Sequence, residues 1–308
     1  MPPHRPSSVL AIFGPTASGK TAVAEAIAAR IPAEVVSADS MQAYEGLPIL
    51  TAQSRGRIVG IWPLSHDGSV AEYQPLAHAA IDEILASGRT PLVVGGTGLY
   101  LRAALANLEL PPEPAEGSRK RWEAFYDERG GHAAHNRLAA VDAAAAARIH
   151  PNDRRRVVRA LELADMGHSL APAGGDRLWT DETRHPTLVV GLDVPKDVLE
   201  RRIEQRTRDM FESGVEDEVS TALAQPLSQT ARKVLGLDEV ARLPREEAMA
   251  ALVVRTRRYA AYQRKWMRRI PGVVMVAANR PPEETADAIL EVARARQQLP
   301  VARAERAR

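Results

Sequence analysis

The chain has 308 residues, of which 45% are hydrophobic and 26% charged, and its formal net charge is +2. These values are typical of a globular protein with a substantial core, and the net charge does not by itself indicate a nucleic-acid partner. The absence of cysteine excludes disulfides, thiol nucleophiles and cysteine-ligated zinc. The first residues lack the apolar core of a signal peptide, and no apolar run is long enough to cross a bilayer. We therefore expect a cytoplasmic protein that does not bind membranes.

The first predicted strand, Val9–Phe13, is followed by Gly14-Pro15-Thr16-Ala17-Ser18-Gly19-Lys20-Thr21 and by a helical pattern over Thr21–Arg30. This octapeptide fits the phosphate-binding pattern G-x-x-x-x-G-K-[ST] in its required strand–loop–helix context. The glycines let successive N–H groups turn toward one anion, and the helix end and the lysine add positive charge. The loop does not reveal which molecule carries the phosphates. The residues predicted to bind a diphosphate are Gly14, Thr16, Ala17, Ser18, Gly19, Lys20 and Thr21, and Thr21 is also the predicted ligand of a magnesium cofactor (Mg2+).

Apolar runs at Glu34–Ala38, Pro91–Val94, Thr187–Leu192 and Val273–Val276 predict four further strands, separated by helical patterns such as Leu76–Ala86. This alternation predicts an α/β fold, a P-loop-containing parallel sheet flanked by helices. Ligands of such sheets bind beyond the carboxyl ends of the strands. Because Gly14, Asp39 and Gly95-Gly96-Thr97 follow three of the predicted strands, we expect them to converge.

No strand pattern occurs between about Leu110 and Gly175, where helical patterns include Trp122–Glu128 and Val141–Ile149. We predict a helical insertion domain at 111–175 that covers or grips the substrate, within a discontinuous α/β core formed by 1–110 and 176–298. Residues 281–298 have the pattern of one amphipathic helix. The last ten residues, 299–308, are predicted to be a disordered basic tail.

Two residues at predicted strand ends have both a structural and a functional interpretation. An aspartate at the position of Asp39 is often only a cap for the following turn, but its place beside the phosphate loop favours a base or a metal partner. Thr97 either donates a hydrogen bond to a phosphate or an acceptor, or belongs to a tight glycine turn. Many phosphate-loop ATPases have an acidic metal partner at the strand end that Gly95–Gly98 occupies here, which counts against nucleotide hydrolysis, although Asp193 after a later strand leaves that possibility open.

Basic residues are concentrated in two segments. Residues 148–159 contain several arginines, and residues 255–269 contain seven basic residues and no acidic one. Each segment is compatible with a solvated helix face or with an RNA contact. In the second segment Arg255, Arg258, Tyr262, Trp266 and Arg269 recur at helical spacing, which suits stacked bases as well as a helix that packs its aromatic side on the core.

Taken together, these motifs resemble the tRNA dimethylallyltransferase family, also called the tRNA isopentenyltransferases. The phosphate loop is common to many families, whereas the other segments in combination are much more specific. The matches occur in the family's order from about Val9 to Val276. They are Gly14–Thr21, Asp39-Ser40-Met41-Gln42, Gly95-Gly96-Thr97-Gly98-Leu99-Tyr100, Arg148-Ile149-His150-Pro151-Asn152-Asp153 with Arg159-Ala160-Leu161-Glu162, Arg202-Ile203-Glu204-Gln205-Arg206, and Tyr259-Ala260 with Gln263 and Trp266.

Three segments depart from the family pattern. The family's Asp-Ile-Gly-Thr-Ala-Lys motif is replaced by Pro48-Ile49-Leu50-Thr51-Ala52-Gln53. The family's His-His-Leu-Ile-Asp motif is missing, with Ile61–Asp67 nearby, and its Ile-Gly-Tyr segment is Leu235-Gly236-Leu237. The chain is thus similar to a divergent branch of the family.

The resemblance implies transfer of a dimethylallyl group from dimethylallyl diphosphate to N6 of the adenine at position 37 of tRNA, next to the anticodon. It implies three catalytic residues, namely Asp39 as the base, Thr97, and Arg206 as a clamp on the diphosphate. Ser40 and Gln42 are the expected readers of the adenine edge. We expect a monomer without an obligate protein partner. The residues expected to contact the anticodon stem-loop of tRNA are Asp39, Ser40, Met41, Gln42, Thr97, Arg119, Arg155, Arg156, Val157, Val158 and Arg159.

Three other interpretations remain open from the residues. A small-molecule kinase would share the phosphate loop, use Asp39 to activate a hydroxyl and turn over ATP. An adenylate isopentenyltransferase would prenylate free AMP, ADP or ATP, although it would not need the arginines of the insertion. A tRNA-binding protein that has lost catalysis would tolerate the altered segment Pro48–Asp67.

Overall fold

The structure is a computed structural model that describes residues 8–171, 178 and 180–296. Contacts between residues divide the chain into two compact units, one formed by 1–107 and 181–308 and the other by 108–180. The predicted tail at 299–308 and the last two positions of the predicted C-terminal helix lie outside the described residues. Within the described part, none of the helices combines the length and the apolar character that a membrane span requires.

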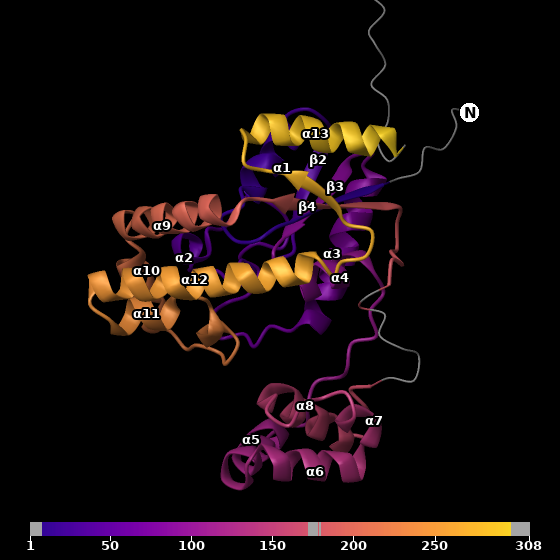
Figure 1. Cartoon of the computed structure of the whole chain (residues 1–308), viewed down its shortest axis with the longest axis vertical. Helices are drawn as coiled ribbons and strands as arrows, with labels where there is room; N and C mark the ends of the chain where they lie inside the picture. The colour runs from indigo at the N-terminus through magenta and orange to yellow at the C-terminus, as the bar shows by residue number, and fades with distance from the viewer. Residues whose placement is uncertain (1–7, 172–177, 179, 297–308) are drawn as a thin grey trace, which may run out of the picture. The chain divides into compact units, whose positions relative to one another are not determined.

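A five-stranded parallel sheet with the order β2-β3-β1-β4-β5 forms the centre of the first unit (Figure 1). All five side chains of the central strand β1 are buried, because it has a strand on each side and helices on both faces. In the register of the sheet, Phe13 lies beside Gly95 and Gly191. The predicted fold class is confirmed. The strands are β1 (Val9–Phe13), β2 (Ala33–Ser37), β3 (Thr90–Gly95), β4 (Thr187–Asp193) and β5 (Val274–Ala277).

Helices cover both faces of this sheet (Figure 1). α1 (Lys20–Ala28) and α13 (Pro282–Ala295) pack side by side on one face, where Leu10 and Ile12 of β1 meet Ile27 and Ile289. α3 (Val70–Ala86) and α4 (Gly98–Leu105) pack on β2 and β3 from the other face.

The expectation that the third helix begins near Leu76 is wrong, because α3 begins six residues earlier, at Val70. Its N-cap, Ser69, accepts a hydrogen bond from the backbone N–H of Glu72, whose carboxylate accepts one from the backbone N–H of Ser69. This reciprocal cap starts a helix efficiently. Pro75 lies inside the helix, beyond its first turn, so α3 lacks the hydrogen bond that an N–H at this position would donate to the carbonyl oxygen of Ala71.

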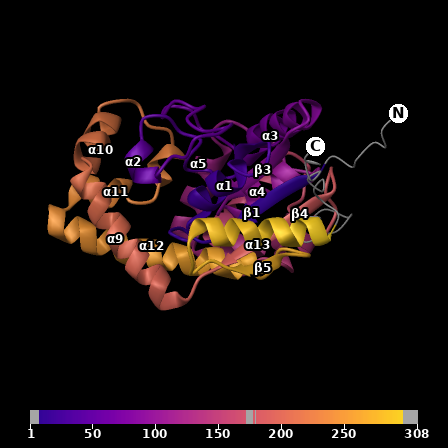
Figure 2. The same ribbon diagram turned by 90° about the horizontal axis from the view of Figure 1, so that it is seen from above.

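The remaining helices of the first unit gather beyond one end of the sheet (Figure 2). α9 follows β4 directly, so this end is the carboxyl end of the strands. The elements are α2 (Pro48–Thr51), α9 (Lys196–Glu212), α10 (Val215–Leu223), the short 3-10 helix Ala231–Lys233, α11 (Leu237–Arg242) and α12 (Arg245–Met267).

The second unit is helical and has its own core. It consists of α5 (Ser118–Arg129), α6 (Gly131–Val141), α7 (Ala143–Ala146) and α8 (Arg154–Asp165) around Leu138, Val157 and Leu161. The prediction of one helix over Val141–Ile149 is wrong. Asp142 interrupts it, because its carboxylate caps α7 by accepting a hydrogen bond from the N–H of Ala145.

The glycines that follow β3 are required by the close approach of α12. A β-carbon on Gly96 would lie 2.3 Å from Nε2 of Gln263, and one on Gly98 would lie 2.1 Å from Cε3 of Trp266. Real β-carbons do not make such contacts, so any side chain at these positions would push α12 away from the sheet.

We predict that Gly98→Ala destabilises the fold by about 1–3 kcal/mol, the usual cost of overpacking a core. This cost exceeds the helix-propensity gain of about 0.5–1 kcal/mol from replacing a helical glycine. Urea unfolding monitored by circular dichroism measures the difference. The same substitution in a Trp266→Ala background should cost markedly less, and an undiminished cost there would contradict the steric explanation.

Candidate active site

The phosphate loop follows β1 and turns sharply into α1. Ala17 and Gly19 have left-handed backbone angles, with φ of 62° and 88°, and α1 begins at Lys20. Nζ of Lys20 donates hydrogen bonds to the carbonyl oxygens of Gly14 and Pro15, both at 2.9 Å. Burial lowers the pKa of Lys20 to about 8, although the nearby carboxylate of Asp39 raises it. The positive charge of Lys20 is therefore only partly compensated within the protein, and an anion bound in the loop would compensate the rest.

Arg206 of α9 reaches the same loop. Its Nη1 donates a hydrogen bond to Oγ1 of Thr16 at 3.1 Å. Burial lowers the pKa of the guanidinium, and Asp39 raises it. Arg202, one turn earlier on α9, donates to the carbonyl oxygen of Ala278 at 3.4 Å and also lines the pocket. Two cationic side chains thus face the phosphate loop from a different element.

Gln263 of α12 joins the phosphate loop to the end of β3. Its Oε1 accepts a hydrogen bond from the backbone N–H of Thr16 at 2.7 Å, and its Nε2 donates to the carbonyl oxygen of Gly96 at 3.0 Å. The side chain is only 2% exposed. Gln263 matches a family pattern in the sequence, but only the fold reveals its two partners.

Asp39 and Thr97 follow neighbouring strands. The carboxylate of Asp39 accepts a hydrogen bond from the N–H of Met41 at 3.0 Å, and Oγ1 of Thr97 lies 3.4 Å from both the backbone nitrogen and the hydroxyl of Ser40. Tyr259 of α12 hydrogen-bonds to Thr97 and Gln263, and burial raises the pKa of its hydroxyl. The expected convergence of the three strand ends is therefore observed, and Tyr259 is a further polar residue at this point.

A cavity of about 370 Å³ opens between the phosphate loop, the β2–α2 loop, α9 and α12. Among the residues singled out from the sequence, Gly14, Ser18, Ser40 and Thr97 do not line it, whereas nine others do: Thr16, Ala17, Gly19, Lys20, Thr21, Asp39, Met41, Gln42 and Arg206. Four lining residues of α9 and α12 were not singled out from the sequence, because their spacing is also that of ordinary core positions: Thr207, Met210, Leu252 and Thr256. Six others belong to segments compared with the family pattern but were given no role there: Leu50, Thr51, Ala52, Ile203, Leu235 and Tyr259.

Gln42 lines the cavity and also ties the β2–α2 loop together. Its Nε2 donates to the carbonyl oxygen of Ala52 at 3.0 Å, and its Oε1 accepts from the hydroxyl of Ser54 at 3.1 Å. The amide that was expected to read a base thus has partners within its own loop.

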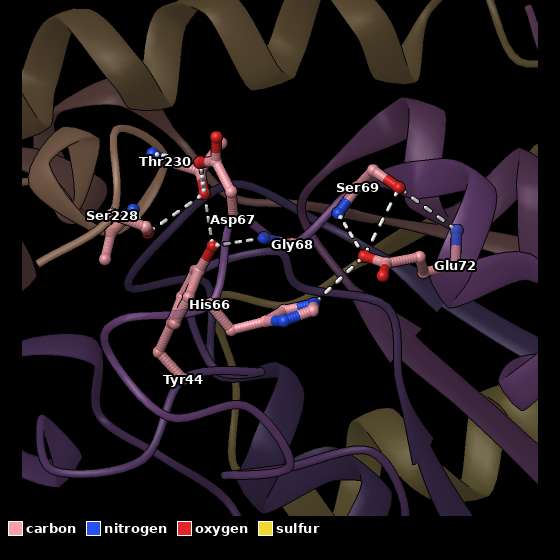
Figure 3. A network of polar contacts seen from close by, with 9 residues as sticks. Tyr44, His66, Asp67, Gly68, Ser69, Glu72, Ser228 and Thr230 are labelled. Carbon is pink, nitrogen blue, oxygen red and sulfur yellow. Dashed lines mark hydrogen bonds and ion pairs between the residues drawn. The ribbon is translucent and has the colours of Figure 1, made fainter. Parts of the chain in front are cut away.

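A polar network fixes the segment between β2 and α3 to the segment before α11 (Figure 3). The hydroxyls of Tyr44 and Thr230 lie 2.6 Å apart, and the Tyr44 hydroxyl also accepts from the N–H of Gly68 at 3.1 Å. The carboxylate of Asp67 accepts from both the N–H and the hydroxyl of Thr230. The region that departs most from the family pattern is therefore held in place by several side-chain hydrogen bonds.

The arginines of the helical unit fall into two groups. Arg119 and Arg159 both pair with the fully buried carboxylate of Glu162, at 2.9 and 3.0 Å. Arg155 and Arg156 are exposed, and Arg156 makes a surface pair with Asp153 at 3.5 Å. Val157 and Val158 are buried. The side chains of Val157 and Val158 are therefore not accessible for the expected contact with tRNA.

The basic stripe on α12 is also divided. Arg255 pairs with Glu239, Arg257 pairs with Glu204, and the ring of Trp266 packs on Gly98. Tyr262 is 56% exposed and belongs to the outer face of the helix. Packing on the core is therefore observed for Trp266, whereas base stacking by Tyr262 stays a prediction.

Comparison with known proteins places this geometry in a family. A family model described as IPP transferase matches residues 42–270, and one described as isopentenyl transferase matches residues 7–56. The tRNA dimethylallyltransferase of Corynebacterium jeikeium is 39% identical over 88% of this chain and 92% of its own length. That of Acidothermus cellulolyticus is 40% identical over 94% and 92%.

Solved structures agree with this assignment. The full-length tRNA isopentenylpyrophosphate transferase of Bacillus halodurans is 32% identical, with a TM-score of 0.66 over 93% of this chain and 96% of its own. A eukaryotic dimethylallyltransferase acting on tRNA, 24% identical, shares the fold with a TM-score of 0.78 over 98% and 82%. The family match spans most of the chain, and the relatives align over nearly their whole length, so this protein belongs to the IPP transferase family, that of the tRNA dimethylallyltransferases.

Proposed function

We propose that the protein transfers a dimethylallyl group from dimethylallyl diphosphate to N6 of adenine 37 in tRNA and releases diphosphate. The observation that carries this proposal is that one pocket contains the phosphate loop with Lys20, the guanidinium of Arg206 and the carboxylate of Asp39. Such a pocket holds an anionic leaving group on one side and a proton acceptor on the other.

Departure of diphosphate builds negative charge on the oxygen that leaves C1 of the prenyl group. Preorganised donors directed at that charge lower the barrier most. Lys20, Arg206 and the N–H groups at the start of α1 supply such donors, and α1 adds the positive end of its dipole. Because burial already disfavours the charged forms of Lys20 and Arg206, a bound diphosphate would restore the balance of charge.

The donor set also fits a magnesium ion. Thr21 contributes a hydroxyl to the pocket, and Mg2+ is commonly held by one or two protein oxygens together with substrate phosphates. No cluster of three or more acidic or histidine side chains that would form an all-protein metal cage occurs among the described residues. Bound there, Mg2+ would neutralise charge on the diphosphate.

Asp39 is the proposed base. As the N6–C1 bond forms and the C1–O bond breaks, N6 becomes positively charged, and one of its protons passes to the carboxylate. The N–H of Met41 fixes one carboxylate oxygen, which leaves the other for the amine. Tyr259 lies beside it in the pocket and can orient the adenine, and Thr97 hydrogen-bonds to Tyr259.

tRNA is the proposed acceptor because the curated relatives are named as tRNA dimethylallyltransferases. An adenine in the anticodon loop must be splayed out of its stack to enter a pocket of this kind, which is usual in the recognition of single-stranded RNA. Arg155 and Arg156 are the proposed phosphate contacts of the helical unit. We propose that the protein acts as a monomer.

We predict that Asp39→Asn lowers the rate of prenyl transfer by about 10²–10⁴-fold, the usual contribution of a positioned base. The assay follows labelled dimethylallyl diphosphate into bulk tRNA, with and without Mg2+, and uses Asp209→Asn on the outer face of α9 as a matched control. Transfer of label to AMP rather than to tRNA would show that a free nucleotide is the acceptor. ATP turnover that depends on Asp39 would indicate a kinase instead.

Lys20 should impose a pH dependence on donor binding. As pH rises through about 8, the free protein loses the Lys20 proton and with it a positive charge that the diphosphate needs. The kcat/KM for dimethylallyl diphosphate should therefore be independent of this group below pH 8 and fall with a slope approaching −1 above it. In Lys20→Met the value should be low throughout and lack this limb; persistence of the limb would assign it to another group.

Arg155→Ala and Arg156→Ala should each raise the KM for tRNA and reduce the salt dependence of its binding by somewhat less than one unit of log K against log salt, the change expected for one lost phosphate contact. The KM for dimethylallyl diphosphate should not change. Arg137→Ala, another exposed arginine of the helical unit, serves as the control. An equal effect of all three substitutions would indicate general electrostatics rather than a defined contact.

A further inference from the structure

The pocket has a polar end and an apolar end, and α12 runs along its length. The α12 residues that line it are Leu252, Thr256, Tyr259 and Gln263, whose spacing of four, three and four places them on one helix face. At 1.5 Å per residue, Leu252 lies about 16 Å along the helix from Gln263. Gln263 contacts the phosphate loop, so Leu252 marks the opposite end.

α9 also passes from the polar to the apolar end of the pocket, but in α9 the polar residue comes first in the chain. Arg206 contacts Thr16 of the phosphate loop, and Met210 lines the pocket one turn later. The ion pair Arg257–Glu204 and the stacking of Arg245 on the ring of Phe211 show that α9 and α12 run antiparallel. Met210 and Leu252 therefore lie at the same, apolar end.

Three leucines close this end. A β-carbon on Gly236 would lie 2.8 Å from Cδ1 of Leu252 and 2.9 Å from Cδ1 of Leu50, so these two side chains meet at the backbone of residue 236. Leu235 lines the pocket immediately before it. Gly236 also has a φ of 95°, which independently favours glycine there.

Both parts of this floor are held in place. The carboxylate of Glu218 on α10 accepts hydrogen bonds from the N–H groups of Ile49 and Leu50, at 2.7 and 2.8 Å, which fixes α2. The segment that leads to Leu235 is anchored through Thr230 by Tyr44 and Asp67 (Figure 3). Leu50 is 5% exposed, so there is little free space behind it for a longer ligand.

We propose that Leu50, Leu235 and Leu252 form a floor that limits the donor to a five-carbon prenyl group. The inference rests on the proposed function. With the diphosphate on the phosphate loop, the prenyl tail extends along α12 toward Leu252, and the side chains of the floor set the longest tail that the pocket admits. The cavity of about 370 Å³ is near the lower limit for small-molecule sites.

Donor selectivity in Leu50→Gly, Leu252→Ala and the double variant tests the floor. The kcat/KM for geranyl diphosphate relative to dimethylallyl diphosphate is measured with the same tRNA. Each single variant should raise this ratio at least tenfold, in line with the 10–200-fold that a single methylene is worth in an apolar pocket, and the double variant should raise it further. Ile49→Ala and Val253→Ala, at neighbouring positions that do not line the pocket, should leave it unchanged.

Binding provides a second measurement that does not require turnover. Calorimetric titration with the unreactive thio analogue of geranyl diphosphate should show tighter binding to the floor variants than to the protein without substitutions. If Leu50→Gly does not fold, Leu50→Ala and Leu252→Val replace the two larger truncations.

An unchanged ratio in folded variants would overturn the floor, as would an equal rise in the control variants. A higher KM for tRNA with unchanged donor selectivity would also overturn it, because it would assign this end of the pocket to the adenosine. If the original chain transferred no prenyl group from dimethylallyl diphosphate, the proposed function itself would fail, which is a separate outcome.

Discussion

The buried amide of Gln263 is the contact on which the geometry of the site depends. It joins the N–H of Thr16 in the phosphate loop to the carbonyl of Gly96 at the end of β3. A buried amide is costly unless both its donor and its acceptor have partners. The loop and the strand end are therefore held at one separation, which in turn fixes where Lys20 lies relative to Asp39 and Thr97. Gly96 can only be glycine, because the amide lies where a side chain would begin.

The charges around the pocket form an unbalanced set. Lys20 and Arg206 are both disfavoured in their charged forms by burial, and Asp39 opposes this shift for each of them. Because Arg202 also lines the pocket, one carboxylate shares it with three cationic side chains, and a bound anion would complete the arrangement. This imbalance suits a multiply charged diphosphate better than a neutral ligand. It also leaves the carboxylate close to the position where a bond to the prenyl carbon would break.

The helical unit contains a buried carboxylate, that of Glu162, which two arginines compensate. Arg119 and Arg159 both pair with it, and their contact with RNA stays a prediction. Without partners, that carboxylate would be strongly destabilising. Arg155 and Arg156 project from the same helix turn into solvent. Arginines at adjacent positions of one helix thus have different surroundings. The amino-acid composition of the segment cannot distinguish the buried pairs from the exposed side chains, because the helix face on which an arginine lies depends on its position.

The sequence by itself determined the alternating α/β fold, the phosphate loop and the convergence of Asp39 and Thr97 with it. These depend on local apolar patterns and on the rule that parallel strands end at the same edge. Only the tertiary structure decided the roles of Gln263, Tyr259, Leu50 and Leu252. They lie on helices α2 and α12, far from the loop in the chain, and their spacing is that of any packed helix face. Which face meets the pocket depends on how the helices beyond the sheet pack together, and that packing is a long-range outcome that no local pattern encodes.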